Sequence, residues 1–264
     1  MKYVAVTGAS GGMGKETVNA LINNGYYVIA LDKSVYQETN LNVTNLECDV
    51  TDEENVKKAY DKICSITNKL DAIIHFAGIY LMDSLVEIEY PKIEKIFKVN
   101  FFGAYLINKT FMPLLQKGSR VITITSELAT TDPLPFTGIY GITKSALDKY
   151  CFSLRMELQL LGIDVSVIRA GAVKTNMLAS STKSLEEFCN KTKLYTCNAE
   201  RFKSIVDKVE TANVEPKKIA KKVINILECK HPKFAYSLNC NKYLKLLSKM
   251  PKCFQFWIIR KILK

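Results

Sequence analysis

The chain has 264 residues, of which 48% are hydrophobic and 24% are charged. This globular composition and length exclude a disordered chain, a collagen-like repeat and a disulfide-stapled miniprotein. The net charge is +11, and all of it comes from residues 214–264, which hold 13 Lys or Arg against two Glu. The sequence therefore indicates a neutral domain with a basic C-terminal end.

The cysteine pattern and the N-terminus bear on the compartment. The eight cysteines form no C-x-x-C pair and no zinc-like spacing, so we expect no metal. Met1, Lys2 and Tyr3 lead directly into an apolar run, which predicts no signal peptide. No uncharged stretch reaches the roughly 18 apolar residues of a membrane span. We therefore expect a cytoplasmic protein with reduced thiols.

Short apolar runs alternate with longer amphipathic stretches through the first 170 residues. Buried strands are predicted at Val4–Thr7, Tyr27–Leu31, Ala72–Phe76, Val121–Thr125 and Val165–Ile168, with a further strand just before Cys48. Helices are predicted at Gly14–Asn24, Glu53–Asn68, Ile93–Leu115 and Gly141–Leu161. Strands separated by helices indicate a doubly wound parallel sheet, which is a Rossmann fold of three α/β/α layers in a single domain.

The remaining third of the chain has a different pattern. Residues 177–213 are polar and show no strand pattern, so we expect a helical or loop insertion that covers the site. A helix is predicted at Pro216–Cys229 and a last strand at Lys233–Leu238. These assignments give a Rossmann-type domain over residues 1–240 and a basic, amphipathic, helical C-terminal segment over residues 241–264.

A glycine cluster follows the first predicted strand and opens a helix. Glycines at such a turn let backbone N–H groups approach a pyrophosphate at the helix N-terminus. A purely structural turn is the alternative, but the position after an N-terminal buried strand favours a dinucleotide. The residues expected to contact this cofactor are Thr7, Gly8, Ser10, Gly12, Met13 and Gly14.

Asp32 ends the second predicted strand, 18 residues after Gly14. A carboxylate there can accept hydrogen bonds from the adenosine ribose and repels a 2′-phosphate, so we expect NAD rather than NADP. A solvated aspartate is the alternative, and the adjacent Lys33 could offset the repulsion. Asp49 and Val50 follow the next strand and are expected near the adenine.

Tyr140 and Lys144 lie one helical turn apart, so their side chains share a face. An unperturbed tyrosine has a pKa of about 10, and a neighbouring cation is expected to lower it. Ser126 ends a strand, where its hydroxyl can hydrogen-bond a substrate oxygen. An isolated Tyr-x-x-x-Lys is usually an exposed helix pair, so the spacing gains meaning only from the other motifs.

Together these residues resemble the short-chain dehydrogenase/reductase family over nearly the whole chain. The matching pieces are Thr7, Gly8, Gly12, Gly14, Asp32, Asp49, Ala77, Gly78, Asn100, Ser126, Tyr140, Lys144 and Gly171 through Thr175. The resemblance implies that Tyr140 exchanges a proton with the substrate oxygen and that Ser126 hydrogen-bonds this oxygen. It also implies that Lys144 holds the nicotinamide ribose and that Asn100 positions a water of the proton relay. The further cofactor contacts implied are Ala77, Gly78, Val173 and Thr175.

The implied activity is hydride transfer between NAD(P)(H) and a secondary alcohol or ketone. The C-terminal end resembles family members that act on retinoids, steroids and hydroxybutyrate, which suggests a lipid-like substrate. The alternative is a catalytically silent protein of the same fold that senses a dinucleotide. A sensor needs no proton-transfer groups, so Asn100, Ser126, Tyr140 and Lys144 favour the enzyme.

Three positions depart from the family pattern. His75 stands where an asparagine is usual, and we expect it to be a packed strand residue. Ala170 replaces the usual proline before Gly171, which is expected to loosen that turn. Ser126 lies 14 residues before Tyr140, one more than usual. Glu127 would restore the spacing, but a carboxylate cannot replace a hydroxyl donor.

The basic C-terminal segment leaves several interpretations open. No acidic residue follows Glu228, and basic residues alternate with apolar ones. A helix packed at a subunit edge is favoured, and the alternatives are peripheral contact with an anionic membrane or a site for anionic substrates or partners. No reading motif accompanies the charge, so we expect no nucleic-acid partner. The apolar patterns of Phe101–Leu115 and Tyr140–Leu161 predict a homodimer or homotetramer.

Overall fold

A computed structural model describes residues 1–34, 40–210 and 213–264. Seven parallel strands form one sheet in the order β3-β2-β1-β4-β5-β6-β7. The strands are Lys2–Thr7 (β1), Tyr26–Asp32 (β2), Val43–Glu47 (β3), Leu70–His75 (β4), Leu115–Ser126 (β5), Asp164–Ala170 (β6) and Ala235–Leu238 (β7). The predicted doubly wound parallel sheet is therefore confirmed.

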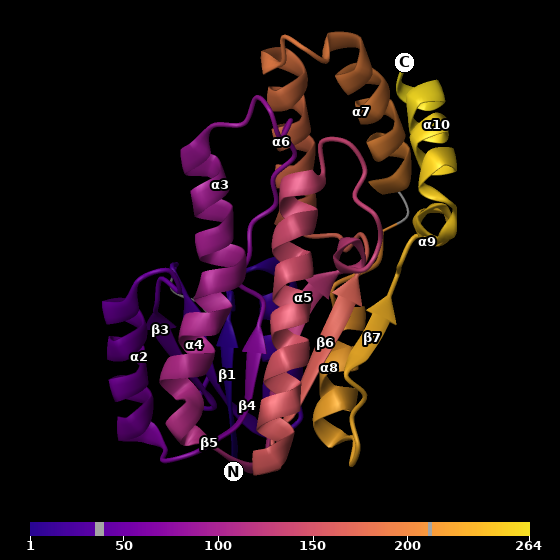
Figure 1. Ribbon diagram of the computed structural model, residues 1–264. Coiled ribbons are helices and arrows are strands. Elements are labelled where there is room, and N and C mark those ends of the chain that lie inside the picture. The colour runs from indigo at the N-terminus through magenta and orange to yellow at the C-terminus, as the bar shows by residue number, and fades with distance from the viewer. Residues whose placement is uncertain (35–39, 211–212) are drawn as a thin grey trace.

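Helices cover both faces of the sheet (Figure 1). Helices α1 (Gly12–Asn23) and α8 (Lys217–Glu228) pack on one face, against Val4 and Val6 of β1. The opposite face, which includes Ala5, is covered by α2 (Glu53–Ile66), α4 (Gly103–Phe111) and α5 (Gly138–Leu158). Successive β1 side chains thus enter different cores, as the two-residue period of a strand requires. This arrangement gives the three layers that the sequence predicts.

The helix predicted at Ile93–Leu115 is interrupted. It begins as α3 (Tyr90–Phe97), passes through a π-helical turn at Lys98–Phe102, continues as α4 and ends in a short 3-10 turn. Leu115 pairs with Leu70 and belongs to β5, so the predicted helix end was wrong. Hydrophobic periodicity misses this boundary because Leu115 is buried on either assignment. The π turn contains Asn100, consistent with the frequent occurrence of such turns at functional sites.

Four helices gather beyond the carboxyl ends of the strands (Figure 1). They are α6 (Asn176–Lys191), α7 (Thr196–Glu210), α9 (Lys242–Lys249) and α10 (Lys252–Leu263). The predicted insertion is mainly helical where it is described, and its residues 211 and 212 lie outside the described chain. Leu263 at the end of α10 is buried with Phe202 of α7 and Phe136. The basic segment therefore packs onto the region that covers the site, and a domain division at residue 240 stays a prediction.

Candidate active site

The turn after β1 leaves no room for a side chain at several of its glycines. Gly8 has a φ of 67°, and a β-carbon there would lie 2.6 Å from the Ala77 nitrogen. A β-carbon on Gly14 would lie 2.1 Å from the Gly8 oxygen, and one on Gly12 would lie 2.9 Å from Cγ2 of Thr175. A glycine-rich turn of this kind at the start of α1 fits the pyrophosphate of a dinucleotide.

Asp32 is fixed at the carboxyl end of β2. Its Oδ2 accepts a hydrogen bond from the Ser10 backbone nitrogen at 2.9 Å, and its Oδ1 accepts one from the Ser34 nitrogen at 3.2 Å. The Lys33 ammonium lies 2.7 Å from Oδ2 of Asp49. The Lys33 ammonium is therefore engaged with Asp49, and the ion pairs among the described residues include none between Lys33 and Asp32.

The remaining expected cofactor residues border the same end of the sheet. Thr7 Oγ1 accepts a 3.4 Å hydrogen bond from the Ala77 nitrogen. Val50 packs against the start of α4, Val173 is buried, and Met13 lines the cavity described below. The structure therefore gathers the cofactor residues expected from the sequence around one edge.

Asn100 ties the loop after β4 to helix α5. Its Oδ1 accepts from the Ile79 nitrogen at 2.8 Å, while its Nδ2 donates to the Ile79 oxygen at 3.0 Å and to Thr143 Oγ1 at 3.1 Å. A β-carbon on Gly78 would lie 3.3 Å from Asn100 Oδ1 and 3.5 Å from Lys144 Nζ. The glycine thus lets the loop pass close to both side chains.

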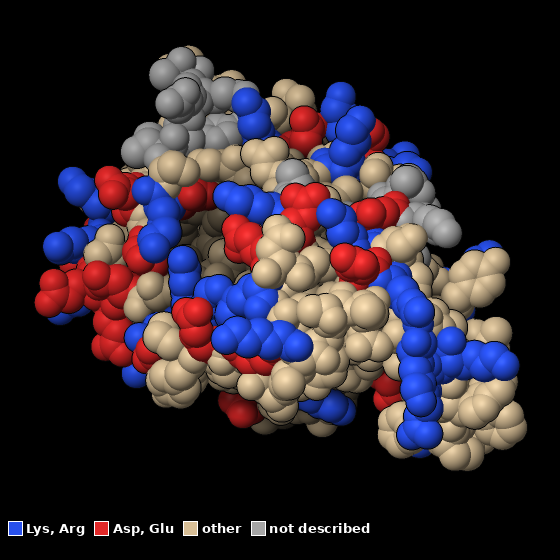
Figure 2. Space-filling view, turned by 90° about the horizontal axis from the view of Figure 1, so that it is seen from above, with Lys and Arg blue, Asp and Glu red and all other residues tan. Residues whose placement is uncertain are grey.

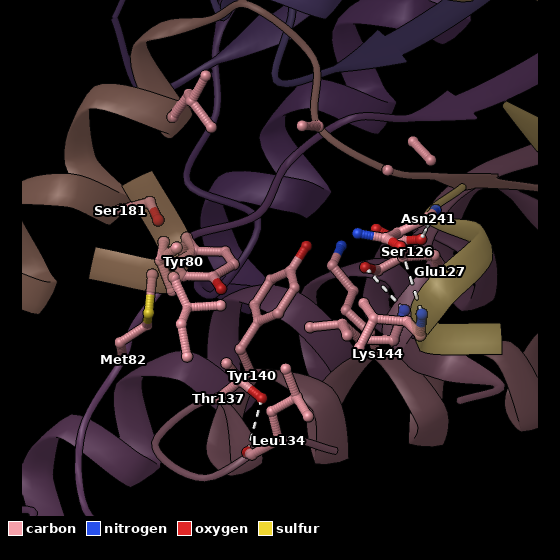
Figure 3. Close-up of a pocket in the computed structure, with 18 of the residues that line it drawn as sticks. Tyr80, Met82, Ser126, Glu127, Leu134, Thr137, Tyr140, Lys144, Ser181 and Asn241 are labelled. Carbon is pink, nitrogen blue, oxygen red and sulfur yellow. Dashed lines mark hydrogen bonds between the residues drawn. The ribbon is translucent and has the colours of Figure 1, made fainter. Parts of the chain in front are cut away.

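Tyr140 lies in the first turn of α5, with its ring buried against Tyr80 at a centroid distance of 4.2 Å. The Lys144 ammonium lies 5.8 Å from the centre of the Tyr140 ring and donates a 3.2 Å hydrogen bond to the Ile124 oxygen. Figure 3 shows the Tyr140 hydroxyl and the Lys144 ammonium pointing the same way into the pocket, with Ser126 beyond them. The structure therefore brings the three expected reactive side chains together.

Burial dominates the ionisation of these groups. It raises the pKa of Tyr140 to about 12, although a hydrogen bond from the Ser126 side chain lowers it. Burial also lowers the pKa of Lys144 to about 8. The expectation that Lys144 lowers the tyrosine pKa is therefore wrong for the polypeptide alone, because burial and the nearby negative charge of Glu127 raise this pKa by more than the hydrogen bond from Ser126 lowers it. Tyr140 holds its proton at neutral pH.

A cavity of about 510 Å³ opens above these side chains. Its polar groups include Ser126, Glu127, Tyr140 and Lys144, and its walls are mainly apolar. The C-terminal helices supply much of this wall, through Leu244, Leu246, Leu247, Met250, Ile258, Ile259, Ile262 and Leu263. The sequence showed the amphipathic pattern of these helices but not which surface their apolar residues face.

Two of the departures from the family pattern have structural explanations. His75 Nε2 lies 2.8 Å from Asn108 Oδ1, and burial lowers the pKa of His75 to about 4, so it is the packed neutral residue that was expected. Gly171 donates a 2.9 Å hydrogen bond to the Leu238 oxygen, and a β-carbon there would lie 2.0 Å from the Asn239 oxygen. The turn after Ala170 is therefore closely packed at Gly171, and the loosening expected from the missing proline stays a prediction.

Three other properties concern metal binding, disulfide bonds and membrane-spanning helices in the described part of the chain. Within it, no group of three His, Cys, Asp or Glu side chains could hold a metal ion. All eight cysteines are free. No helix among the described residues has both the length and the apolar character to cross a bilayer.

The glycine turn and the cavity with its tyrosine, lysine and serine define a dinucleotide-dependent oxidoreductase. A family model described as short chain dehydrogenase matches residues 2–186. A probable short-chain type dehydrogenase/reductase, VdlC of Helicobacter pylori, is 30% identical over 83% of this chain and 81% of that protein. The 3-ketodihydrosphingosine reductase of Bacteroides thetaiotaomicron is 26% identical over 88% and 86% of the two chains.

A solved structure has the same fold. A short chain dehydrogenase family protein from Francisella tularensis superimposes with a TM-score of 0.75 at 22% identity, covering 90% of this chain and 97% of that one. The chain therefore belongs to the short-chain dehydrogenase/reductase family, and it is an NAD(P)-dependent enzyme.

Proposed function

We propose that this enzyme interconverts an apolar, lipid-like secondary alcohol and its ketone, with NAD(H) as the preferred hydride carrier. The observation that carries the proposal is the cavity, because a buried tyrosine, serine and lysine lie within apolar walls. Such walls favour a hydrocarbon chain, while the few polar groups orient the reacting carbon–oxygen group. The relative named as a 3-ketodihydrosphingosine reductase acts by that name on a lipid ketone, which supports the same class of substrate.

The reactive side chains have separate tasks in this proposal. The dinucleotide, when bound, exchanges the hydride with the substrate carbon. Tyr140 gives its proton to the carbonyl oxygen in reduction and takes it back in oxidation, and Ser126 donates a hydrogen bond to that oxygen. Lys144 holds the nicotinamide ribose, while Asn100 fixes the loop beneath it and positions a water for the proton relay. This complete set disfavours a silent dinucleotide sensor.

The preference for NAD rests on the end of β2. The Asp32 carboxylate is held toward the glycine turn by Ser10, and the neighbouring Lys33 pairs with Asp49. A carboxylate at this place that is not in an ion pair with a described residue can accept hydrogen bonds from ribose hydroxyls and repels a 2′-phosphate. The described residues therefore favour NADH over NADPH.

We also propose a homodimer or homotetramer formed through α4 and α5. These helices expose large apolar side chains, including Tyr105, Phe152 and Met156, the last of which is 54% exposed. Apolar surface of this kind is characteristic of a subunit interface. Sedimentation at micromolar concentration is expected to give a multiple of 29.8 kDa, and a species of that mass alone would contradict the proposal.

We further propose a cytoplasmic location with peripheral contact to anionic membranes. Among the side chains of α9 and α10, Phe254, Phe256 and Trp257 are exposed, the last of them by 59%. Basic and uncharged side chains meet at the right-hand edge of Figure 2, where these helices lie. Aromatic side chains beside lysines suit the interface of an anionic bilayer. Packing this surface against the same surface of a second copy would instead bring like charges together, which disfavours a subunit contact here.

A ketone series tests the catalytic proposal. Methyl ketones of increasing chain length are mixed with NADH, and its oxidation is followed by nicotinamide absorbance. We expect kcat/KM to rise with chain length because each added methylene enters an apolar wall. Tyr140→Phe should lower turnover roughly a hundredfold to ten-thousandfold. No turnover of any chain length, or full turnover by Tyr140→Phe, would overturn the proposal.

A further inference from the structure

One carboxylate lies among the apolar walls of the cavity. Glu127 is the only acidic residue among the described residues that line it. Glu127 directly follows Ser126, and adjacent residues of a strand normally point to opposite faces. Here β5 ends at Ser126 and a 3-10 turn begins at Glu127, so both residues line the same cavity.

The contacts of Glu127 use only part of the carboxylate. Its Oε2 accepts a hydrogen bond from the Asn241 backbone nitrogen, at the start of α9 (Figure 3). Its Oε1 accepts no hydrogen bond from the described residues, and it lies 3.2 Å from the place where a Gly171 β-carbon would be. The described ion pairs do not include Glu127. One carboxylate oxygen therefore holds the start of α9, while the other accepts no hydrogen bond from the described residues.

Fastening α9 does not explain the negative charge. A single backbone N–H needs one acceptor, which a neutral amide side chain would also supply. Burial raises the pKa of Glu127, and the hydrogen bond from Asn241 and the attraction of Lys245 only partly oppose this effect. A partly buried charge without a close partner is costly, so a cationic ligand would find an uncompensated partner here.

We propose that Glu127 determines substrate specificity by binding an amino group next to the reacting carbonyl carbon. Since it rests on the proposed function, this inference narrows the substrate class to long-chain amino ketones and the corresponding amino alcohols. The apolar walls hold the hydrocarbon chain, Tyr140 and Ser126 hold the oxygen, and Glu127 holds the ammonium. Lys144 is the other charged side chain at this end of the cavity, and its sign excludes it as the amine partner.

A matched set of ketones tests this assignment. Aminomethyl undecyl ketone and ethyl undecyl ketone differ by an ammonium in place of a methyl group, and hydroxymethyl undecyl ketone offers a neutral donor. Their kcat/KM values are measured with NADH at a pH where the amine is protonated. We expect the wild type to favour the aminomethyl ketone over the ethyl ketone by about tenfold to a hundredfold, as a charge-assisted hydrogen bond provides.

Two substitutions separate recognition from the fastening of α9. Glu127→Gln keeps an acceptor for Asn241 but removes the charge, so the preference for the amine should fall to about twofold or less. Asp132→Asn is the control, because the Asp132 carboxylate also contacts the C-terminal segment, through Lys252, but does not line the cavity. We expect this variant to retain the wild-type preference.

The outcomes distinguish this inference from the proposed function. Reduction of the ethyl ketone without a preference for the amine, or with a preference that Glu127→Gln retains, overturns the role of Glu127 and leaves the proposed function standing. An equal preference for the hydroxymethyl ketone overturns the amine assignment. Failure of the wild type to reduce any of the three ketones overturns both.

Discussion

Lys144 is expected to destabilise the folded polypeptide even though the proposed reaction requires it. Its side chain is 5% exposed, and burial lowers its pKa from 10.5 to about 8. Because one pKa unit corresponds to about 1.4 kcal/mol, the protonated side chain lowers the free energy of unfolding by roughly 3 kcal/mol at pH 7. Lys144→Met removes this charge but loses the hydrogen bond to the Ile124 oxygen, which contributes about 1 kcal/mol. We expect a net gain in stability of about 2 kcal/mol, together with loss of turnover.

The pH dependence of this gain identifies its cause. The folded pKa of Lys144 lies below its unfolded value, so the folded state binds fewer protons between about pH 8 and about pH 10.5. Wild-type stability therefore rises with pH in this window relative to Lys144→Met. The advantage of the variant is largest below pH 8 and should shrink by roughly 2 kcal/mol between pH 7 and pH 10.

Calorimetric unfolding without added dinucleotide measures both the gain in stability at pH 7 and its decrease toward pH 10. At roughly 2–4 °C per kcal/mol for a chain of this size, the variant should unfold about 4–8 °C above the wild type at pH 7. Lys149→Met is the matched control, because Lys149 is exposed on the same helix and loses the same charge. The reasoning would be refuted if Lys144→Met were less stable than the wild type at pH 7. It would also be refuted if the difference in stability between the two proteins did not change with pH.

Three further variants test other parts of the account. Asp32→Ser should lower the ratio of NADH to NADPH affinity at least about tenfold in calorimetric titration, and an unchanged ratio would remove the carboxylate from cofactor selection. Replacing Phe256 and Trp257 by serine should abolish sedimentation with anionic vesicles, whereas retained binding would contradict the membrane proposal. Phe202→Ala should cost about 3–5 kcal/mol in denaturant unfolding, because Phe202 is fully buried beside Phe136. A cost below about 1 kcal/mol would show that this cluster is loosely packed.

The sheet and the cofactor turn could be predicted because local pattern determines them. Runs such as Val4–Thr7 are apolar in every residue or nearly so, which is typical of a strand buried on both faces. The structure shows why glycines are needed after β1, since a β-carbon added to Gly14, for example, would lie 2.1 Å from the Gly8 oxygen. Tyr140 and Lys144 share a face through helical spacing alone, so they too could be placed from the sequence.

Other features depend on contacts between distant segments. The π turn at Asn100 involves hydrogen bonds to Ile79 and Thr143, which no local pattern encodes. Glu127 is held by a hydrogen bond from Asn241, 114 residues further along the chain. The pKa of Tyr140 is raised mainly by burial, whereas the lysine four residues later in the sequence, Lys144, suggested that it would be lowered. These features could not be predicted from the sequence because tertiary packing determines them.

The central claim is that Tyr140 passes a proton to a carbonyl oxygen while the dinucleotide delivers the hydride. The most direct test reduces ethyl undecyl ketone with NADH deuterated at the transferred position and analyses the alcohol by mass spectrometry. We predict that the wild type places the label on the carbinol carbon and that Tyr140→Phe, with dinucleotide affinity confirmed by calorimetry, forms the alcohol at least about a hundredfold more slowly. An alcohol without the label, or undiminished turnover by Tyr140→Phe, would contradict the account.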